Sequence, residues 1–392
     1  MPQTITAPLT VALAAACGLI AANLYYAQPL IGLIGPSLGL PLEATGLIVT
    51  LIQIGYVFGL ALVVPLGDLL ESRRLICTIL CLTAVALAAA SLAPTAPIFL
   101  AACLAIGVTS VVAQILVPLA AHLASDANRG RVVGNVMSGL LLGILLARPV
   151  SSLIAHAAGW RPVFGLSAGV MLILALALRR ILPLRNPTHD SSYLGLLRSL
   201  WVLFANSPLL RRRAVCHAAL FGAFSLFWTG VPLLLAGPAF GLTQRGIAFF
   251  ALAGAAGAVI APVAGRFADR GWTRPAMAIN MLIVAASFIL AHIAGSGSMP
   301  LLVAAAILLD LGVSANMVLS QRAIYGIDAA ARSRLNGVFM SIFFAGGALG
   351  SALASWSYVG GGWARLSWIG LAFAAVALIL YALELLAESR AK

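Results

Sequence analysis

Two ionisable side chains, Arg148 and Asp310, lie deep inside long apolar runs of this 392-residue chain. They are the only two strongly ionisable residues that we expect at that depth. A charge at the centre of a membrane helix costs about 2.5–3.5 kcal/mol on insertion scales, so neither side chain is expected to face lipid. The sequence predicts that Arg148 and Asp310 pair, and that protonation of Asp310 releases the pair. A static ion pair, or two separately solvated groups, is the structural alternative.

A second set consists mainly of acidic and basic residues in the segments just after or just before apolar runs. This set, a predicted cytoplasmic gate, consists of Gly67, Asp68, Glu71, Arg73, Arg74, Arg129, Arg131, Gly265, Asp269, Arg270, Arg274, Arg332 and Arg334. Because helix N-termini carry partial positive charge, they attract acids. We expect Glu71 to approach the helix that starts at Arg332 and Arg334. We likewise expect Asp269 to approach the helix that starts at Arg129 and Arg131. The alternative is that these arginines only set membrane orientation.

Polar and aromatic residues inside the apolar runs form a third set, the predicted substrate-binding residues. They are Asn23, Tyr25, Tyr26, Gln28, Gln53, Tyr56, Gln114, Phe224, Phe227, Trp228 and Asn316. A cavity that mixes aromatic faces with a few hydrogen-bonding groups suits an amphiphilic organic molecule. Tyr and Trp also gather at membrane interfaces, and Asn or Gln can bridge helices, so a structural role is the alternative. Tyr25, Tyr26 and Gln28, beside the helix-weakening Pro29, are the strongest candidates.

The sequence offers no other recognisable chemistry. The five cysteines have no metal-ligand spacing, and the five histidines are scattered without pairing. No catalytic nucleophile with a base emerges, so we expect no enzyme activity, no metal and no cofactor. The phosphate-binding motif G-x-x-x-x-G-K-[ST] is absent, so we expect no nucleotide as an energy source, which leaves a gradient across a membrane.

Long apolar runs must position these residues. The chain is 62% hydrophobic and only 8% charged, which is far below the charged fraction of an ordinary soluble domain. A span needs about 20 predominantly apolar residues. The sequence therefore predicts an all-α membrane protein with twelve transmembrane helices, at residues 9–34, 44–66, 75–93, 97–121, 132–156, 160–182, 213–236, 244–265, 276–295, 299–321, 335–357 and 363–386.

Basic residues set the orientation of these spans. Nineteen of the 23 Lys and Arg residues fall in the loops after even-numbered spans or at the C-terminus, and three fall on the other side. The positive-inside rule then places both termini in the cytoplasm of a multi-pass protein of the bacterial inner membrane. The net charge of +13 has this origin, so we expect the lipid bilayer and no nucleic acid as a partner.

An internal repeat divides the chain into two halves. The segment that begins at Arg129 aligns with the segment that begins at Arg332, at an offset of 203 residues. The same offset relates Gly159-Trp160 to Gly362-Trp363. We therefore predict two pseudo-symmetric six-helix bundles, 1–182 and 213–392, joined by a cytoplasmic linker at 183–212.

The segment from Gly265 to Arg274, Gly-Arg-Phe-Ala-Asp-Arg-Gly-Trp-Thr-Arg, resembles the signature loop of the major facilitator superfamily. The segment from Gly67 to Arg74 is a degenerate copy. Gly139, Gly143 and Ala147-Arg148-Pro149 look like the motif of the family's bacterial drug:proton antiporters. The resemblance implies the major facilitator fold. The chain departs from the branch at Cys103, where many members carry an arginine, and it lacks an acid in its first span.

The resemblance implies a secondary active transporter that works by alternating access. We expect proton-coupled efflux of a small amphiphilic molecule or drug, by a monomer that binds its substrate and protons. Two alternatives stay open. One is uptake or facilitated transport of an organic anion, because Arg148 could bind a carboxylate. The other is a membrane receptor that does not transport.

Overall fold

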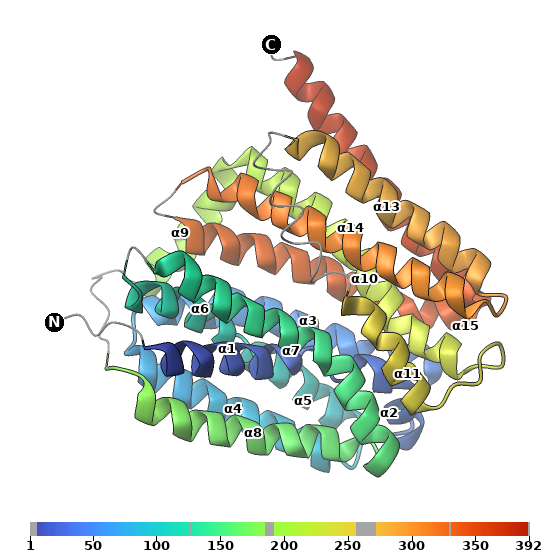
Figure 1. Cartoon of the computed structure of the whole chain (residues 1–392), viewed down its shortest axis with the longest axis horizontal. Helices are drawn as coiled ribbons and strands as arrows, with labels where there is room; N and C mark the ends of the chain where they lie inside the picture. The colour runs from blue at the N-terminus through green and yellow to red at the C-terminus, as the bar shows by residue number, and fades with distance from the viewer. Residues whose placement is uncertain (1–5, 126–127, 185–191, 256–271, 329–330, 391–392) are drawn as a thin grey trace. The chain divides into compact units, whose positions relative to one another are not determined.

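The computed structural model describes residues 6–125, 128–184, 192–255, 272–328 and 331–390, and every regular element in these ranges is helical (Figure 1). Nine of the described segments are long and apolar enough to cross a membrane. The last of them, in α15, contains two crossings, because non-helical backbone at Gly361 and Gly362 kinks it. This kink separates the two spans that were predicted at 335–357 and 363–386.

The chain divides into two compact units. One unit consists of Met1–Ala27 with Leu51–Ser199, and the other of Gln28–Thr50 with Leu200–Lys392. The segment Gln28–Thr50 belongs to the second unit through contacts with α10 and α15. Its Thr50 and Thr45 hydroxyls lie 2.9 Å from those of Ser351 and Ser355, respectively. The predicted boundaries at residues 182 and 213 stay a prediction.

The first unit is built from apolar helices that pack in pairs. Helix α4 lies along α8, and α1 lies along α7 (Figure 1). The helices that begin in this unit are α1 (Ala7–Ala22), α4 (Ser72–Leu92), α5 (Ala96–Thr109), α6 (Val112–Leu123), α7 (Arg129–Ala158), α8 (Arg161–Ile181) and α9 (Tyr193–Asn206).

The second unit is built around α10 (Pro208–Ala236), which packs along α15 (Arg332–Arg390). Every residue of α10 from Cys216 to Leu235 is buried. Its other elements are η1 (Gln28–Leu30), α2 (Ile31–Ser37), η2 (Leu42–Ala44), α11 (Gln244–Ala251), η5 (Leu252–Ala255), α13 (Thr273–Ala294) and α14 (Met299–Tyr325). The span predicted at 244–265 begins with α11 and η5, and its remainder lies outside the described residues.

Two predicted spans are interrupted rather than straight. In the span predicted at 9–34, α1 ends at Ala22, and the amides of Asn23, Leu24 and Tyr25 bond three residues back instead of four. Pro29 explains the break, because proline cannot donate a hydrogen bond and its ring clashes with the preceding turn. In the span predicted at 44–66, α3 (Leu47–Phe58) continues as the π turn η3 (Gly59–Val63) and then η4 (Val64–Asp68).

Glycines allow the closest helix contacts in both units. A Cβ added at Gly143 of α7 would meet the backbone of Gly18, and one at Gly346 of α15 would meet the backbone of Ala218. These two glycines lie 203 positions apart, so the sequence repeat is also a repeat of packing. The contact extends one turn earlier in the first unit, at Gly139. It extends one turn later in the second unit, at Gly350.

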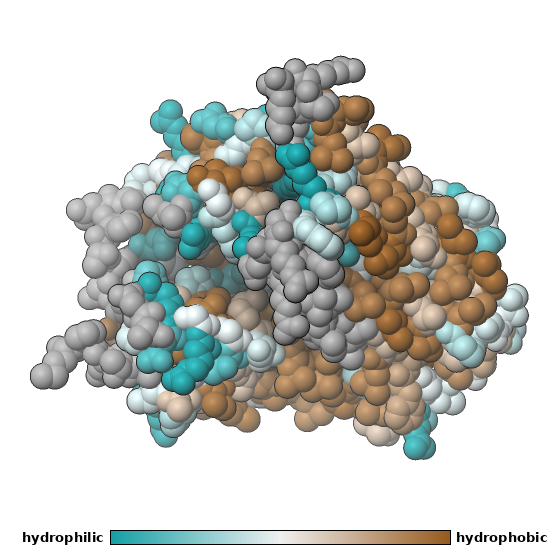
Figure 2. All heavy atoms as spheres, turned by 45° about the horizontal axis from the view of Figure 1, so that its top comes forward, coloured by the Kyte–Doolittle hydropathy of each residue, from teal (hydrophilic) through white to brown (hydrophobic). Residues whose placement is uncertain are grey.

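Hydrophobic side chains form large continuous areas of the surface (Figure 2). The exposed residues Val85 of α4, Ile173 of α8 and Ile279 of α13 all lie within spans. A soluble protein rarely exposes such areas, whereas lipid-facing helices must. All five cysteines are free, and all lie in α1, α4, α5 or α10.

Candidate functional site

Asp310 lies near the middle of α14, and its side chain is held by α10. The indole Nε1 of Trp228 donates a hydrogen bond of 2.9 Å to Asp310 Oδ2. Asp310 is 5% exposed and Trp228 is 2% exposed. Gly254 of η5 lies against both, since a Cβ added there would be 3.3 Å from the indole and 3.6 Å from Asp310 Oδ1.

Arg148, the other predicted coupling residue, lies in α7 and is 4% exposed. Its guanidinium carbon lies 5.0 Å from the centre of the Tyr25 ring. This cation–π contact places Arg148 beside one of the predicted substrate-binding residues. Asp310 belongs to the other unit, so the pairing of Arg148 with Asp310 stays a prediction.

The side chain of Asn23, a predicted substrate-binding residue, contacts a neighbouring helix. Ser167 Oγ of α8 donates a hydrogen bond of 2.6 Å to Asn23 Oδ1, and Asn23 Nδ2 lies 3.5 Å from Met171 Sδ. Asn23 is fully buried. These contacts match the structural alternative, in which an amide bridges neighbouring helices.

Tyr56 and Gln114 are brought together from α3 and α6, where Gln114 Nε2 donates a bond of 3.1 Å to the Tyr56 hydroxyl. Gln53, one turn earlier in α3, is buried in the same unit. Gln28 is buried in η1 of the second unit. Tyr26 lies in the turn after α1 and is partly exposed.

The predicted aromatic residues of the second unit form part of a longer series. Phe224 stacks on Phe221, and Phe221 stacks on Phe343 of α15, with ring centres 3.7 Å apart. Phe227 packs edge-on against Phe288 and Trp363. Phe227 therefore has the contacts of a core residue of this unit.

His217, which the sequence analysis left without a role, continues this series. Its ring stacks on Phe339 and Phe343, and its Nδ1 lies 3.5 Å from the amide nitrogen of Asn316. Both side chains are fully buried. Among the described residues, neither His217 Nε2 nor Asn316 Oδ1 has a hydrogen-bond partner. Only the fold brings His217 and Asn316 together, since they lie 99 positions apart.

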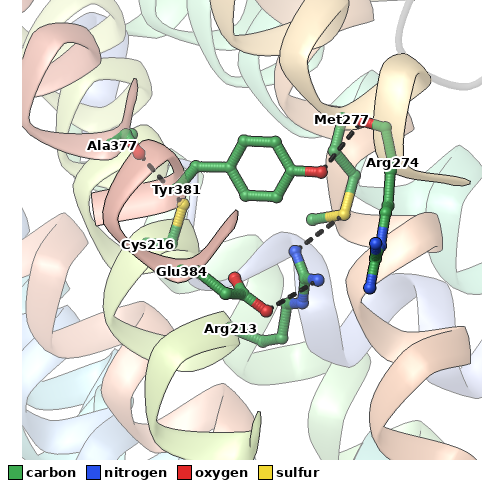
Figure 3. Close-up of polar contacts among 7 residues, drawn as sticks. All are labelled: Arg213, Cys216, Arg274, Met277, Ala377, Tyr381 and Glu384. Atoms are coloured by element: carbon green, nitrogen blue, oxygen red, sulfur yellow. Dashed lines mark hydrogen bonds and ion pairs between the residues drawn. The ribbon is translucent and has the colours of Figure 1, made fainter. Parts of the chain in front are cut away.

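The sequence analysis missed one buried ion pair. Figure 3 shows that Arg213 of α10 and Glu384 of α15 form this pair, with Nη2 and Oε1 3.0 Å apart. Arg213 Nη1 also lies 2.9 Å from Met277 Sδ of α13, and the guanidinium lies over the Tyr381 ring. The Tyr381 hydroxyl donates to the carbonyl of Arg274 (2.9 Å). Each of the two charged residues lies close to the end of a predicted span, where charges are common. The sequence therefore did not predict that they are buried.

The predicted gate residues are described only in part. Gly265, Asp269 and Arg270 lie outside the described residues. The Glu71 carboxylate caps α4 by accepting from the backbone amides of Arg73 (2.8 Å) and Arg74 (2.7 Å). This capping uses the positive end of the helix. The predicted approaches of Glu71 and Asp269 to later helices stay predictions.

The arginines that start α7 and α15 make repeated contacts. Arg129 Nε donates to the carbonyl of Ala121, and Arg332 Nε donates to the carbonyl of Tyr325, each at 3.2 Å. Arg129 and Arg332 each lie on the surface, as do Asp68, Arg74 and Arg131, whereas Gly67 and Arg334 are partly exposed. The two arginines thus each brace the end of the preceding helix.

Apolar helices in two units, with charged and polar side chains buried inside them, define a polytopic membrane transporter. The sequence model of the Major Facilitator Superfamily matches residues 12–325, and the chain belongs to this family. The chain is 41% identical over 374 residues to the uncharacterized transporter YgaY of Escherichia coli O157:H7, covering 95% of this chain and 94% of that protein. It is 34% identical to the probable transporter SCO4007 of Streptomyces coelicolor, covering 95% and 89%.

Solved structures share the fold. The nucleoside transporter NupG, as a D323A mutant, matches with a TM-score of 0.75 at 17% identity, covering 95% of this chain and 97% of that one. A D-xylose-proton symporter matches with a TM-score of 0.69 at 16% identity, covering 96% and 97%. The predicted fold class is therefore confirmed: an all-α membrane protein with the major facilitator fold.

Proposed function

We propose that this transporter exchanges protons for a small amphiphilic molecule and exports that molecule by alternating access. The observation that carries the proposal is the Asp310 carboxyl, buried near the middle of α14 and held by the Trp228 indole. Ionisable groups inside membrane helices are costly, and they commonly belong to proton or substrate pathways. One proton that crosses 100 mV supplies about 2.3 kcal/mol, roughly a fifty-fold concentration ratio.

The buried aromatic and amide side chains support an amphiphilic substrate. In the second unit, the rings of Phe224 and Trp228 provide apolar faces, and Asn316 with His217 provides polar atoms. In the first unit, Tyr56 with Gln114 provides a second polar pair. Binding sites for amphiphilic molecules combine these two kinds of surface. The resemblance of Gly139–Pro149 to the motif of drug:proton antiporters favours export over import.

Flux into vesicles tests the proposal. A compound panel is first screened for thermal stabilisation of the purified protein, because ligand binding raises apparent stability. Compounds that stabilise it are then assayed in proteoliposomes with and without an imposed pH gradient. We expect gradient-driven accumulation by the wild type, and loss of gradient dependence in Asp310→Asn. Glu43→Gln, which alters an exposed acid at the start of η2, is the control and should behave like the wild type.

Uptake of an organic anion is the second candidate. It is favoured by one observation, the buried Arg148 guanidinium beside Tyr25. An arginine in such a place can bind a carboxylate in two parallel hydrogen bonds. Stabilisation by carboxylic acids that is lost in Arg148→Gln, with transport that ignores the pH gradient, would favour this candidate over proton-coupled export. A chain that binds compounds and moves none would favour a receptor.

A further inference from the structure

Gly254 of η5 lies between the buried pair of Asp310 with Trp228 and the accessible surface. A Cβ added at Gly254 would be 3.3 Å from the Trp228 indole and 3.6 Å from Asp310 Oδ1. Gly254 itself is partly exposed, whereas Asp310 and Trp228 are 5% and 2% exposed. At this point the Asp310 carboxyl is therefore covered by a residue that has no side chain.

Large rings cover other sides of the same indole. Phe227 and Phe224 of α10 pack against Trp228 with ring centres 5.6 and 6.3 Å away, and Phe250 of α11 packs against it at 5.9 Å. Phe250 lies four positions before Gly254, so the same segment presents first a ring and then a glycine to Trp228. A ring excludes water, whereas a glycine lets other groups approach closely.

The backbone changes its conformation at this place. Helix α11 ends at Ala251, and η5 continues from Leu252 to Ala255 as a 3-10 turn inside a span that was predicted as one helix. A 3-10 stretch within a helix often marks a functional position. The irregular turn and the glycine thus coincide with the contact to Asp310 and Trp228.

Asp310 is the only acid in the described residues of α10, α11, η5, α13 and α14. From α15, Glu384 is paired with Arg213. The arginines and histidines of the five elements lie within ten residues of a helix end: they are Arg211, Arg212, Arg213, His217, Arg245, Arg274, His292 and Arg322. Within these elements, a proton that arrives beside Gly254 therefore meets one acid, Asp310.

We propose that Gly254 is a positioning residue for proton transfer, because the space left by its missing side chain lets water reach the Asp310 carboxyl while Trp228 holds that carboxyl in place. A proton reaches a carboxyl from a group within hydrogen-bond distance or through a water, so a buried acid needs such a route. The proposal rests on the proposed role of Asp310 in proton coupling.

Carbodiimide labelling tests access to Asp310 without any transported compound. The full-length protein in proteoliposomes is treated with the water-soluble ethyl-dimethylaminopropyl carbodiimide and glycine ethyl ester, which convert an accessible carboxyl into an amide that peptide mass spectrometry locates. We expect Asp310 to be labelled in the wild type. Labelling should be roughly tenfold slower in Gly254→Val, a factor that corresponds to about 1.4 kcal/mol. Gly337→Val is the control, because nothing lies within 4 Å of a Cβ added there.

Two variants of the same shape separate hydration from packing. Gly254→Thr fills the same space as Gly254→Val, but its hydroxyl can hydrogen-bond a water beside the carboxyl. Both variants should lose similar thermal stability. Flux driven by a pH gradient, measured with a compound that stabilises the protein, should fall severalfold further in Gly254→Val than in Gly254→Thr. Gly254→Ala adds one methyl group and should have the smallest effect.

Two outcomes would overturn the proposal. In the first, Asp310 of the wild type is not labelled, or is labelled only by the lipid-soluble dicyclohexylcarbodiimide, which would mean that no water passes Gly254. In the second, Asp310 is labelled equally in the wild type and in Gly254→Val, and the variants differ from the wild type in thermal stability alone. Expected labelling without gradient-driven flux in the wild type would contradict the proposed function and still support the route past Gly254.

Discussion

The two units of this transporter stabilise their buried polar groups in different ways. In the first unit the described contacts are hydrogen bonds between neutral groups, such as Asn23 with Ser167 and Tyr56 with Gln114, and a cation over a ring at Arg148. The second unit contains the ion pair of Arg213 with Glu384 and the carboxyl of Asp310 held by Trp228. The repeat therefore conserves the packing of the helices, while the polar chemistry differs between the units.

The first helix of each half shows a second difference. The span that begins with α1 is broken after Ala22, whereas α10 runs unbroken from Pro208 to Ala236. Pro232 lies within α10 without ending it. Before Pro29, in contrast, the amides of residues 23 to 25 each bond the carbonyl three residues earlier, which ends the α-helical pattern. The break puts Asn23, Tyr25 and Tyr26 on irregular backbone. In membrane proteins such backbone survives where protein or water surrounds it.

Breaking the ion pair should have the largest effect on stability. Glu384→Gln leaves the buried Arg213 without its carboxylate, and removing one partner of such a pair costs about 3–5 kcal/mol. We expect a large drop in the thermal unfolding temperature in detergent. The double variant Arg213→Leu with Glu384→Ile removes both buried charges and should be much more stable than Glu384→Gln alone. Equal losses in both variants would contradict this account.

Removing the donor to Asp310 should have the next largest effect. Trp228→Phe keeps an aromatic ring and deletes the hydrogen bond to a charged group, which is worth about 1.5–3 kcal/mol. We expect lower thermal stability and slower gradient-driven flux. In Asp310→Asn the hydrogen-bonded carboxylate is already absent, so adding Trp228→Phe should then cost less than it does in the wild type. Additive losses would show that the indole acts by packing alone.

The glycine contacts test whether the two units are alike in packing. Gly143→Ala and Gly346→Ala each place a methyl group against the backbone of the neighbouring helix, and overpacking costs about 1–3 kcal/mol. We expect similar losses of thermal stability in both variants. Gly134→Ala and Gly337→Ala are matched controls on α7 and α15, because nothing lies within 4 Å of an added Cβ. A loss confined to one unit would break the symmetry of packing.

The smallest effect is expected at a neutral contact of the first unit. Tyr56→Phe removes the hydroxyl that accepts from Gln114, and a neutral hydrogen bond is worth about 0.5–1.5 kcal/mol. Thermal unfolding should shift slightly, and Gln114→Leu should shift it by a similar amount. If Tyr56→Phe instead abolished flux while stability stayed near the wild type, the pair would be part of the substrate site.

The spans and the repeat were predictable because both depend on local composition and fixed spacing. The signal for a membrane helix is one apolar run, and Gly143 and Gly346 differ by the offset of the repeat. Asp310 and Arg148 stood out because each charge interrupts such a run. Trp228 was predicted as a substrate residue, and its bond to Asp310 became visible only once α10 and α14 packed together.

Three features could not be predicted for physical reasons. Arg213 and Glu384 lie near the ends of predicted spans, where charged residues are common because water can hydrate them. Their burial results from the packing of helices that are far apart in the sequence. His217 gains its environment from α14 and α15, far along the chain. Helix α9 is short. A hydropathy average over a window long enough to detect a span therefore also includes the polar residues on either side of α9.

The placement of the five thiols makes the two units accessible to distance measurements. Cys17, Cys77, Cys81, Cys103 and Cys216 lie within helices that lipid or protein surrounds. A charged maleimide spin label reacts only with thiols that are exposed to water, so it should leave these thiols unmodified. Cysteines introduced at the exposed Thr95 and Ser296 lie in corresponding loops of the two halves. Pulsed electron resonance on such a doubly labelled, otherwise native chain can then follow the separation of the halves during transport.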